Sequence, residues 1–216
     1  MAEQSERIDR RRVRTRAALL HAGQTLFATR AVDGVSIDDI VAAADVAKGS
    51  FYNHFPDKDA LARELAHHAR LAVEALVATV SEGVDDPAER VARALCAFAR
   101  QAMEDPTGVR MGARLFYGAA IPDAPMNAGV RADIQAGFKA GRFRDLSLEG
   151  GVLMAVGVVQ MAVARVLDRD TPAEAASLSR DLAFGLLRGL GLDEAAARKI
   201  AAKAAADIFA GHSPPR

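Results

Sequence analysis

Residues 36–61 read SIDDIVAAADVAKGSFYNHFPDKDAL, and this stretch decides how the N-terminal part of the chain folds. Ser36 precedes apolar residues at the i, i+3, i+4 and i+7 spacing, which predicts a helix with Ser36 as its N-cap. Asp39, three residues later, predicts a capping-box-like pair with Ser36. The helix is expected to end at Ala44 and Asp45, because Asp tolerates the left-handed conformation that a tight turn needs.

A second helix is expected from about Ala47 to Phe55, where Pro56 stops it. Phe51 and Phe55 are four residues apart and fall on its buried face. Its opposite face carries side chains that form hydrogen bonds, namely Lys48, Ser50, Tyr52 and Asn53. Asp57 is expected to cap a third helix. Two helices joined by a short turn, the second polar on its outside, have the geometry that enters a DNA major groove.

The run VAKGSFYNHF at residues 46–55 resembles the signature of the TetR family of bacterial transcriptional regulators. The resemblance covers about residues 10–70, and beyond them the chain agrees with the family in length and helical character. Asp45 stands where such proteins often carry Gly, and Ala47 stands where Ser often caps the recognition helix. The resemblance implies an all-α protein, with a three-helix DNA-binding domain at 10–70 and a larger helical ligand-binding and dimerisation domain at 71–211.

The same resemblance implies a sequence-specific transcriptional regulator, a ligand-responsive repressor that binds a palindromic operator as a homodimer. Its DNA-binding residues are expected to be Ser36, Lys48, Gly49, Ser50, Tyr52, Asn53, His54, Lys58 and Arg14. Tyr52 and His54 are assigned to phosphates, and Ser50 and Asn53 to base edges. Lys58 is expected to anchor a phosphate as a point charge. An alternative interpretation makes His54 a capping or core-facing residue.

A basic run precedes the first amphipathic helix, which is expected at about residues 14–29. It consists of Arg10, Arg11, Arg12, Arg14 and Arg16. One interpretation is a solvated, disordered tail. The other is an arm that reaches into a minor groove or along the DNA backbone. Because the formal net charge is +0, the distribution of charge rather than its sum carries any DNA-binding signal.

Half of the residues are hydrophobic and only 5% are aromatic, a composition that favours helices throughout. Further helices are predicted at about 58–80, 87–104, 109–117, 124–140 and 193–209. Two more, at about 147–168 and 172–190, are expected to pair with their symmetry mates in the homodimer. The first is nearly all apolar, but Arg165 interrupts it before the roughly 20 residues that a bilayer requires, so we expect a buried helix.

The resemblance also implies a small-molecule effector pocket in the C-terminal domain. Its candidate wall residues are Phe98, Met103, Met111, Phe116, Tyr117, Phe138, Met154, Gln160 and Met161. Each of them is also compatible with a place in an ordinary core. The few polar groups among them favour an apolar or amphipathic ligand.

The sequence carries no motif for catalysis, a metal or a cofactor. Cys96 is the only cysteine and lies among apolar residues, so it is expected to be a buried small hydrophobe. His67 and His68 are neighbours, not the i, i+4 pair that chelates zinc. The N-terminus lacks an apolar signal-peptide run, so a cytoplasmic protein is expected. Two alternatives stay open: an interaction module that no longer binds DNA, or a small-molecule-binding protein or enzyme that merely carries the motif.

Overall fold

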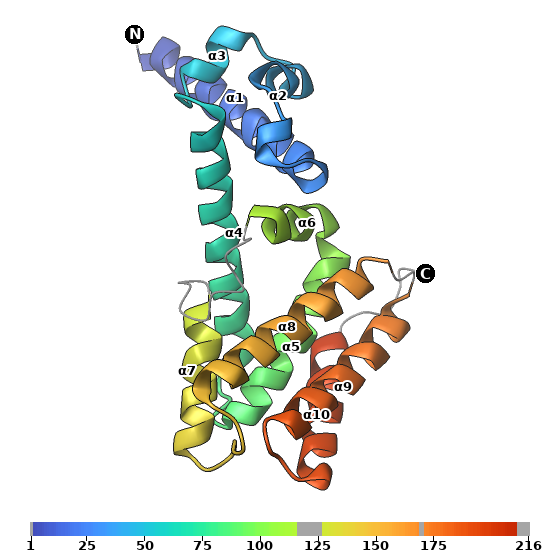
Figure 1. Ribbon diagram of the computed structural model, residues 1–216. Coiled ribbons are helices and arrows are strands. Elements are labelled where there is room, and N and C mark those ends of the chain that lie inside the picture. Colours follow the sequence, from blue (N-terminus) through green and yellow to red (C-terminus); the bar gives the residue numbers. More distant parts are fainter. Residues whose placement is uncertain (1, 116–126, 169–170, 211–216) are drawn as a thin grey trace. The chain divides into compact units, whose positions relative to one another are not determined.

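The computed structural model describes residues 2–115, 127–168 and 171–210, with side chains from residue 10 onward. The secondary structure of these residues is entirely helical, as predicted (Figure 1). Its elements are α1 (Ala2–Thr29), the 3-10 turn η1 (Val32–Gly34), α2 (Ile37–Ala44), α3 (Lys48–Tyr52), α4 (Lys58–Ser81), α5 (Pro87–Glu104), α6 (Pro106–Leu115), α7 (Ala128–Lys139), α8 (Leu148–Val166), α9 (Pro172–Gly189) and α10 (Glu194–Phe209).

The chain divides into two compact units, Met1–Leu71 with Thr107–Tyr117 and Ala72–Pro106 with Gly118–Arg216. We call them the head and the body. The sequence predicted a boundary near residue 70, with every later residue in the second domain. Helix α6 instead belongs to the head, because Met111 is buried in the head core and Arg114 Nε donates to the Ala28 carbonyl at 3.1 Å.

Local hydrogen bonds build the helix-turn-helix as the sequence predicted. The Asp39 amide donates to Ser36 Oγ at 3.0 Å, and the Ser36 amide donates to Asp39 Oδ2 at 3.0 Å, which completes the capping box. Asp45 ends α2 in the left-handed conformation, with φ 52° and ψ 51°. The turn thus relies on the tolerance of Asp for a backbone shape that most residues avoid.

The head core consists of large side chains from all of its helices. Its fully buried members include Leu19, Phe27, Ile40, Phe51 and Leu61. Helix α3 is shorter than predicted and ends at Tyr52. Pro56 disfavours the helical region at Phe55, the residue before it, so the predicted continuation of the helix to Phe55 is opposed. Phe55 is nevertheless buried as predicted, and its amide donates to the Phe51 carbonyl at 2.9 Å.

Helix α1 corrects one interpretation of the basic run. It begins at Ala2, twelve residues before the predicted start at Arg14, so the run at residues 10–16 is helical and not a disordered tail. The interpretation that these arginines reach a DNA groove or backbone stays a prediction. Helical geometry places residues i, i+1 and i+4 of this run on one side of α1.

The body is organised around α5, which contacts α7, α8, α9 and α10. Small side chains dominate the buried faces of α5 and α10, including Ala88, Ala92, Ala97, Ala197, Ala201 and Ala204. Small residues let helix backbones approach closely. Arg142 fastens the loop after α7 by a two-point contact with Asp86, through Nε–Oδ1 at 3.1 Å and Nη2–Oδ2 at 2.6 Å.

Helix α8 is long and apolar enough to cross a membrane by length and composition, although core helices of soluble proteins pass the same test. One of its faces is buried through residues such as Val152, Ala155 and Ala162. The other face leaves Leu153 40% and Met161 65% exposed. The prediction of a buried helix is therefore correct for only one side of α8 within a single chain.

Candidate nucleic-acid interface

The exposed side of α3 presents polar groups over a buried aromatic support. Tyr52 is 52% exposed and packs edge-on against the buried Phe51 ring, with 5.6 Å between centroids. A side chain in place of the Gly49 hydrogen would meet nothing within 4 Å. The surface at the start of α3 is therefore open to close approach by another molecule.

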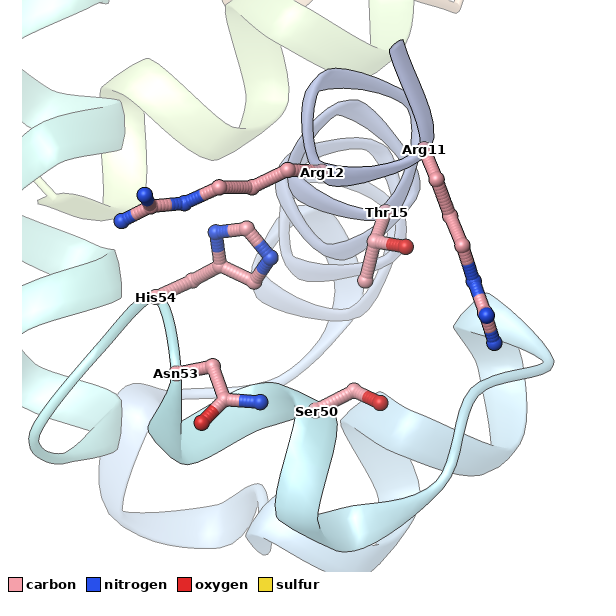
Figure 2. A pocket seen from close by; sticks show the side chains of 6 residues that line it. All are labelled: Arg11, Arg12, Thr15, Ser50, Asn53 and His54. Atoms are coloured by element: carbon pink, nitrogen blue, oxygen red, sulfur yellow. The ribbon is translucent and has the colours of Figure 1, made fainter. Parts of the chain in front are cut away.

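An open hollow of about 490 Å³ lies between α1 and the α3 region (Figure 2). Its lining consists of Arg11, Arg12 and Thr15 from α1, and Ser50, Asn53 and His54 from α3 and the turn that follows. Figure 2 shows the two arginine side chains extending along either side of the other four. Two guanidinium groups beside the Thr15 hydroxyl and the His54 imidazole suit an anion that also accepts hydrogen bonds, such as a phosphodiester.

Three of the predicted DNA-binding residues thus share this hollow, whereas Arg14 does not line it. Arg11 and Arg12 belong to the basic run that one interpretation of the sequence directed to DNA, but they were not among the individually assigned residues, and neither was Thr15. Helical spacing would have placed residues 11, 12 and 15 on one side of α1 if the helix had been extended upstream. Only the fold shows that this side of α1 lies beside the α3 region.

His54 is half-buried at the edge of this hollow. Burial is the main cause that lowers its pKa, and the charges of Arg12 and Arg16 lower it further. The imidazole is therefore mainly neutral at pH 7. A neutral imidazole can still donate one hydrogen bond to a phosphate oxygen.

Arg16 links two helices of the head. Its Nη2 lies 2.5 Å from Glu64 Oε1, and its guanidinium carbon lies 5.4 Å from the centroid of the Phe55 ring. The side chain joins α1 to α4 across the edge of the core. This contact uses a different part of the basic run from the arginines that line the hollow.

The charge of Lys48, at the start of α3, is engaged within the motif. Its Nζ lies 2.8 Å from Asp38 Oδ1, and both side chains are largely exposed, at 53% and 72%. The hydrogen bond that Lys48 donates to Asp38 and the charge of that carboxylate raise the pKa of Lys48. The expected contact of Lys48 with DNA would therefore start from an ion pair.

Lys58 is not the free charge that the sequence predicted. Its Nζ donates to the carbonyls of Val32, Asp33 and Val35 at 3.0, 3.3 and 3.1 Å. An ammonium group has three protons, so these carbonyls occupy all of them. Lys58 holds the loop before α2 in place, rather than presenting a free point charge to a phosphate. The Ser36 hydroxyl is likewise engaged, since it donates to Asp39 Oδ2 at 2.9 Å.

The candidate effector residues do not share one environment. Met111 lies in the head core, which corrects its assignment to the C-terminal domain. Gln160 and Met161 are exposed on α8 and are not cavity walls within the single chain. Phe98, Met103, Phe138 and Met154 are half-buried in the body, and Phe116 and Tyr117 lie outside the described residues.

The Cys96 thiol is not a reactive group in this fold. Cys96 is fully buried, as predicted, and burial raises its pKa to about 12, so the thiol stays protonated at neutral pH. Within the described ranges, no group of three His, Cys, Asp or Glu side chains could hold a metal ion.

The fold and this site define a helix-turn-helix protein with a separate helical C-terminal unit. Residues 19–65 match the model of the bacterial regulatory proteins of the tetR family. Over 79 residues the chain is 33% identical to the HTH-type transcriptional repressor DhaR of Mycobacterium sp. (strain GP1), which covers 37% of this chain. The match spans 40% of the length of DhaR.

Solved structures extend the similarity over nearly the whole chain. A crystal structure of RolR in complex with the ligand resorcinol is 30% identical, covers 90% of this chain and 96% of RolR, and has a TM-score of 0.57. CprB from Streptomyces coelicolor, in complex with its operator, shares the fold at 23% identity with a TM-score of 0.69, covering 94% of this chain and 100% of CprB. The chain belongs to the TetR family of bacterial regulatory proteins.

Proposed function

We propose that this protein is a sequence-specific transcriptional regulator that binds a palindromic DNA operator as a homodimer. The observation that carries the proposal is the hollow in which Arg11 and Arg12 of α1 face the polar side of α3. A phosphate seated there would fix the register of α3 on the duplex. Phosphate contacts set position, and side chains at base edges set sequence preference.

The charge distribution explains why α1 is central to this proposal. Residues 31–60, which contain the whole helix-turn-helix, have six Asp residues and two Lys residues. Lys48 is paired with Asp38, and the Lys58 ammonium is used by backbone carbonyls. The motif itself therefore offers little free positive charge to DNA. We propose that Arg11 and Arg12 supply it instead.

Within α3, we propose distinct roles for the exposed groups. Ser50 and Asn53 face base edges, where a hydroxyl or an amide can discriminate between bases. Tyr52 and His54 contact phosphates from either side. Gly49 allows the backbone to approach the duplex, because the space beside it is open.

We propose that the exposed face of α8, with α9, forms the homodimer interface. Leu153 and Met161 on this face are large and apolar, and they lack cover in the single chain. A two-fold axis would make the same face meet itself. Two heads would then read half-sites about 34–36 Å apart, which requires a roughly palindromic operator.

We further propose that a small organic effector controls the protein, most simply by releasing a repressor from DNA. The RolR structure holds resorcinol, and DhaR is named as a repressor. The half-buried Phe98, Met103, Phe138 and Met154 remain candidates for the effector site in the body. We assign no catalytic activity, and we place the protein in the cytoplasm with the DNA that it regulates.

The test begins with selection of bound sequences from a random DNA pool at about 100 mM salt, where phosphate contacts still contribute. Enrichment of a palindrome is expected. Failure of a folded dimer to enrich any sequence would contradict the proposal, provided that candidate effectors had been removed by refolding.

The hollow is then tested with the double variant Arg11→Ala/Arg12→Ala. Loss of two phosphate contacts should reduce the slope of log affinity against log salt by about 1.8, since each contact contributes about 0.9. Arg14→Ala is the matched control, because Arg14 is exposed on the same helix but does not line the hollow. A larger effect of Arg14→Ala would favour the original sequence assignment instead.

A further inference from the structure

The ion pair between Asp38 and Lys48 joins the two helices of the motif across their turn. Asp38 is the second residue of α2, and Lys48 is the first residue of α3. Their charged atoms are 2.8 Å apart on an exposed surface. The pair therefore holds the only lysine of α3 beside the face that carries Ser50 and Asn53.

An exposed ion pair contributes little to stability, because water and salt screen the attraction between the two charges. Stabilisation of the fold therefore does not account for this pair. Its position matters more, because a lysine at the edge of a DNA-reading face usually behaves as a flexible point charge that reaches any nearby phosphate. A carboxylate beside it opposes that contact, since the carboxylate and the phosphate carry like charges.

We propose that Asp38 is a specificity-determining residue of the DNA site, because it withholds the Lys48 ammonium from phosphates and positions it as a donor to a base edge. This inference rests on the proposed DNA-binding function. One Lys48 proton is used by Asp38, which leaves two for acceptors on DNA. Guanine offers two such acceptors, O6 and N7, in the major groove.

The consequence differs between non-specific DNA and the operator. Non-specific affinity depends almost entirely on phosphate neutralisation, so withholding one ammonium lowers it. The operator retains the Lys48 contact with a base edge while the ion pair stays closed. Asp38 thus increases the ratio of operator affinity to non-specific affinity. The nearby Lys58 adds no free ammonium, because three backbone carbonyls accept its hydrogen bonds.

The experiment compares Asp38→Asn with the wild-type protein on a random-sequence duplex and on the selected operator. Asp38→Asn should tighten binding to the random duplex by about threefold to tenfold at 50 mM salt and steepen its salt slope by about 0.9, the value for one added phosphate contact. Operator affinity should change less, and guanine preference at one position of each half-site should weaken. Asp38→Glu keeps the carboxylate and should restore the wild-type behaviour.

Two controls separate the ion pair from bulk charge. Asp45→Asn removes one charge from the turn of the same motif, and Asn tolerates the left-handed backbone there. The double variant Asp38→Asn/Lys48→Ala should lose the gain on random DNA. Equal slopes for Asp38→Asn and Asp45→Asn, or a gain that persists without Lys48, would overturn the inference.

A measurement without DNA keeps the inference separate from the proposed function. The pKa of Lys48, followed by NMR of its side-chain methylene groups, should fall in Asp38→Asn because the variant lacks the carboxylate that raises it. An unchanged pKa overturns the ion pair in solution. If the pKa falls but no variant binds any duplex, the proposed function fails and this inference fails with it.

Discussion

The head and the body of this chain build their hydrophobic cores from side chains of different size. The head buries large residues, such as Phe27, Phe51 and Leu61, from the long helices α1 and α4 and the short helix α3. The body packs its helices through alanines on α5 and α10. Short helices such as α2 and α3 have few positions with which to hold the core, so each position needs a large side chain. The helices of the body distribute the same task over many small side chains.

This contrast explains why the head has a recognisable sequence pattern and the body does not. Replacing an aromatic residue such as Phe51 would leave a cavity that the short helices α2 and α3 cannot fill. An alanine face can vary more widely, provided that small residues stay at the close contacts. The exposed surfaces of the two units also differ. The exposed side of α3 is polar, whereas the exposed side of α8 carries the apolar residues Leu153 and Met161.

The largest expected effect comes from Phe51→Ala in the head core. Truncation of a fully buried Phe typically costs about 3–5 kcal/mol, and Phe51 is 0% exposed. Amide hydrogen exchange should show lost protection in α2 and α3 while α5 and α10 keep theirs. Phe184→Ala is the control, because Phe184 is half-buried in the body. Equal loss of protection in both units would refute the contrast.

A smaller effect is expected from Ala92→Leu in the body. Ala92 is 0% exposed on α5, and added methylene groups in a closely packed core cost about 1–3 kcal/mol. Urea denaturation measures the change in the free energy of unfolding. Ala195→Leu adds the same volume at an exposed position of α10 and should be nearly neutral. A neutral Ala92→Leu would mean that the body does not depend on small residues at this contact.

Met161→Glu tests the apolar surface of α8. Burying a carboxylate in the proposed dimer should weaken self-association by at least about tenfold, or roughly 1.4 kcal/mol. Sedimentation velocity over a concentration series measures this change. The fold of the single chain should persist, since Met161 is exposed there. Ala202→Glu adds the same charge on α10, and an identical effect from it would exclude α8 as the specific interface.

The smallest effect concerns the pH dependence of the head. The pKa of His54 is lowered in the folded chain by burial and by Arg12 and Arg16. In the unfolded chain it returns to about 6.5. As the pH falls below about 6.5, the unfolded chain takes up a proton more readily than the folded chain, so stability decreases down to the folded pKa.

Thermal melts at about pH 7.5 and pH 5.5 should therefore show a smaller decrease in Tm for His54→Gln than for the wild-type protein. His21→Gln is the control, because His21 is exposed on α1. The idea fails if both variants reduce the pH dependence equally.

The sequence predicted the place of a residue best where its interaction partners are close to it in the chain. The Ser36–Asp39 capping box and the turn at Asp45 depend on neighbours within a few residues, and the sequence predicted both. The burial of Phe51 and Phe55 was predicted from their helical spacing, although distant helices of the head supply their neighbours. Lys58 is not the free point charge that the sequence predicted, because its carbonyl partners lie 23 to 26 residues away in the chain. Met111 was misplaced for the same reason, since its burial depends on distant helices of the head.

The sequence by itself determined the helical class, the helix-turn-helix and the polar side of α3, because periodicity and capping act over one or two helical turns. Only the tertiary structure decided which charges are free. It joined Lys48 to Asp38, gave the Lys58 protons to three carbonyls, and brought Arg11 and Arg12 into one hollow with Ser50, Asn53 and His54. Electrostatic partners depend on distances in space, and those distances exist only once the helices have packed.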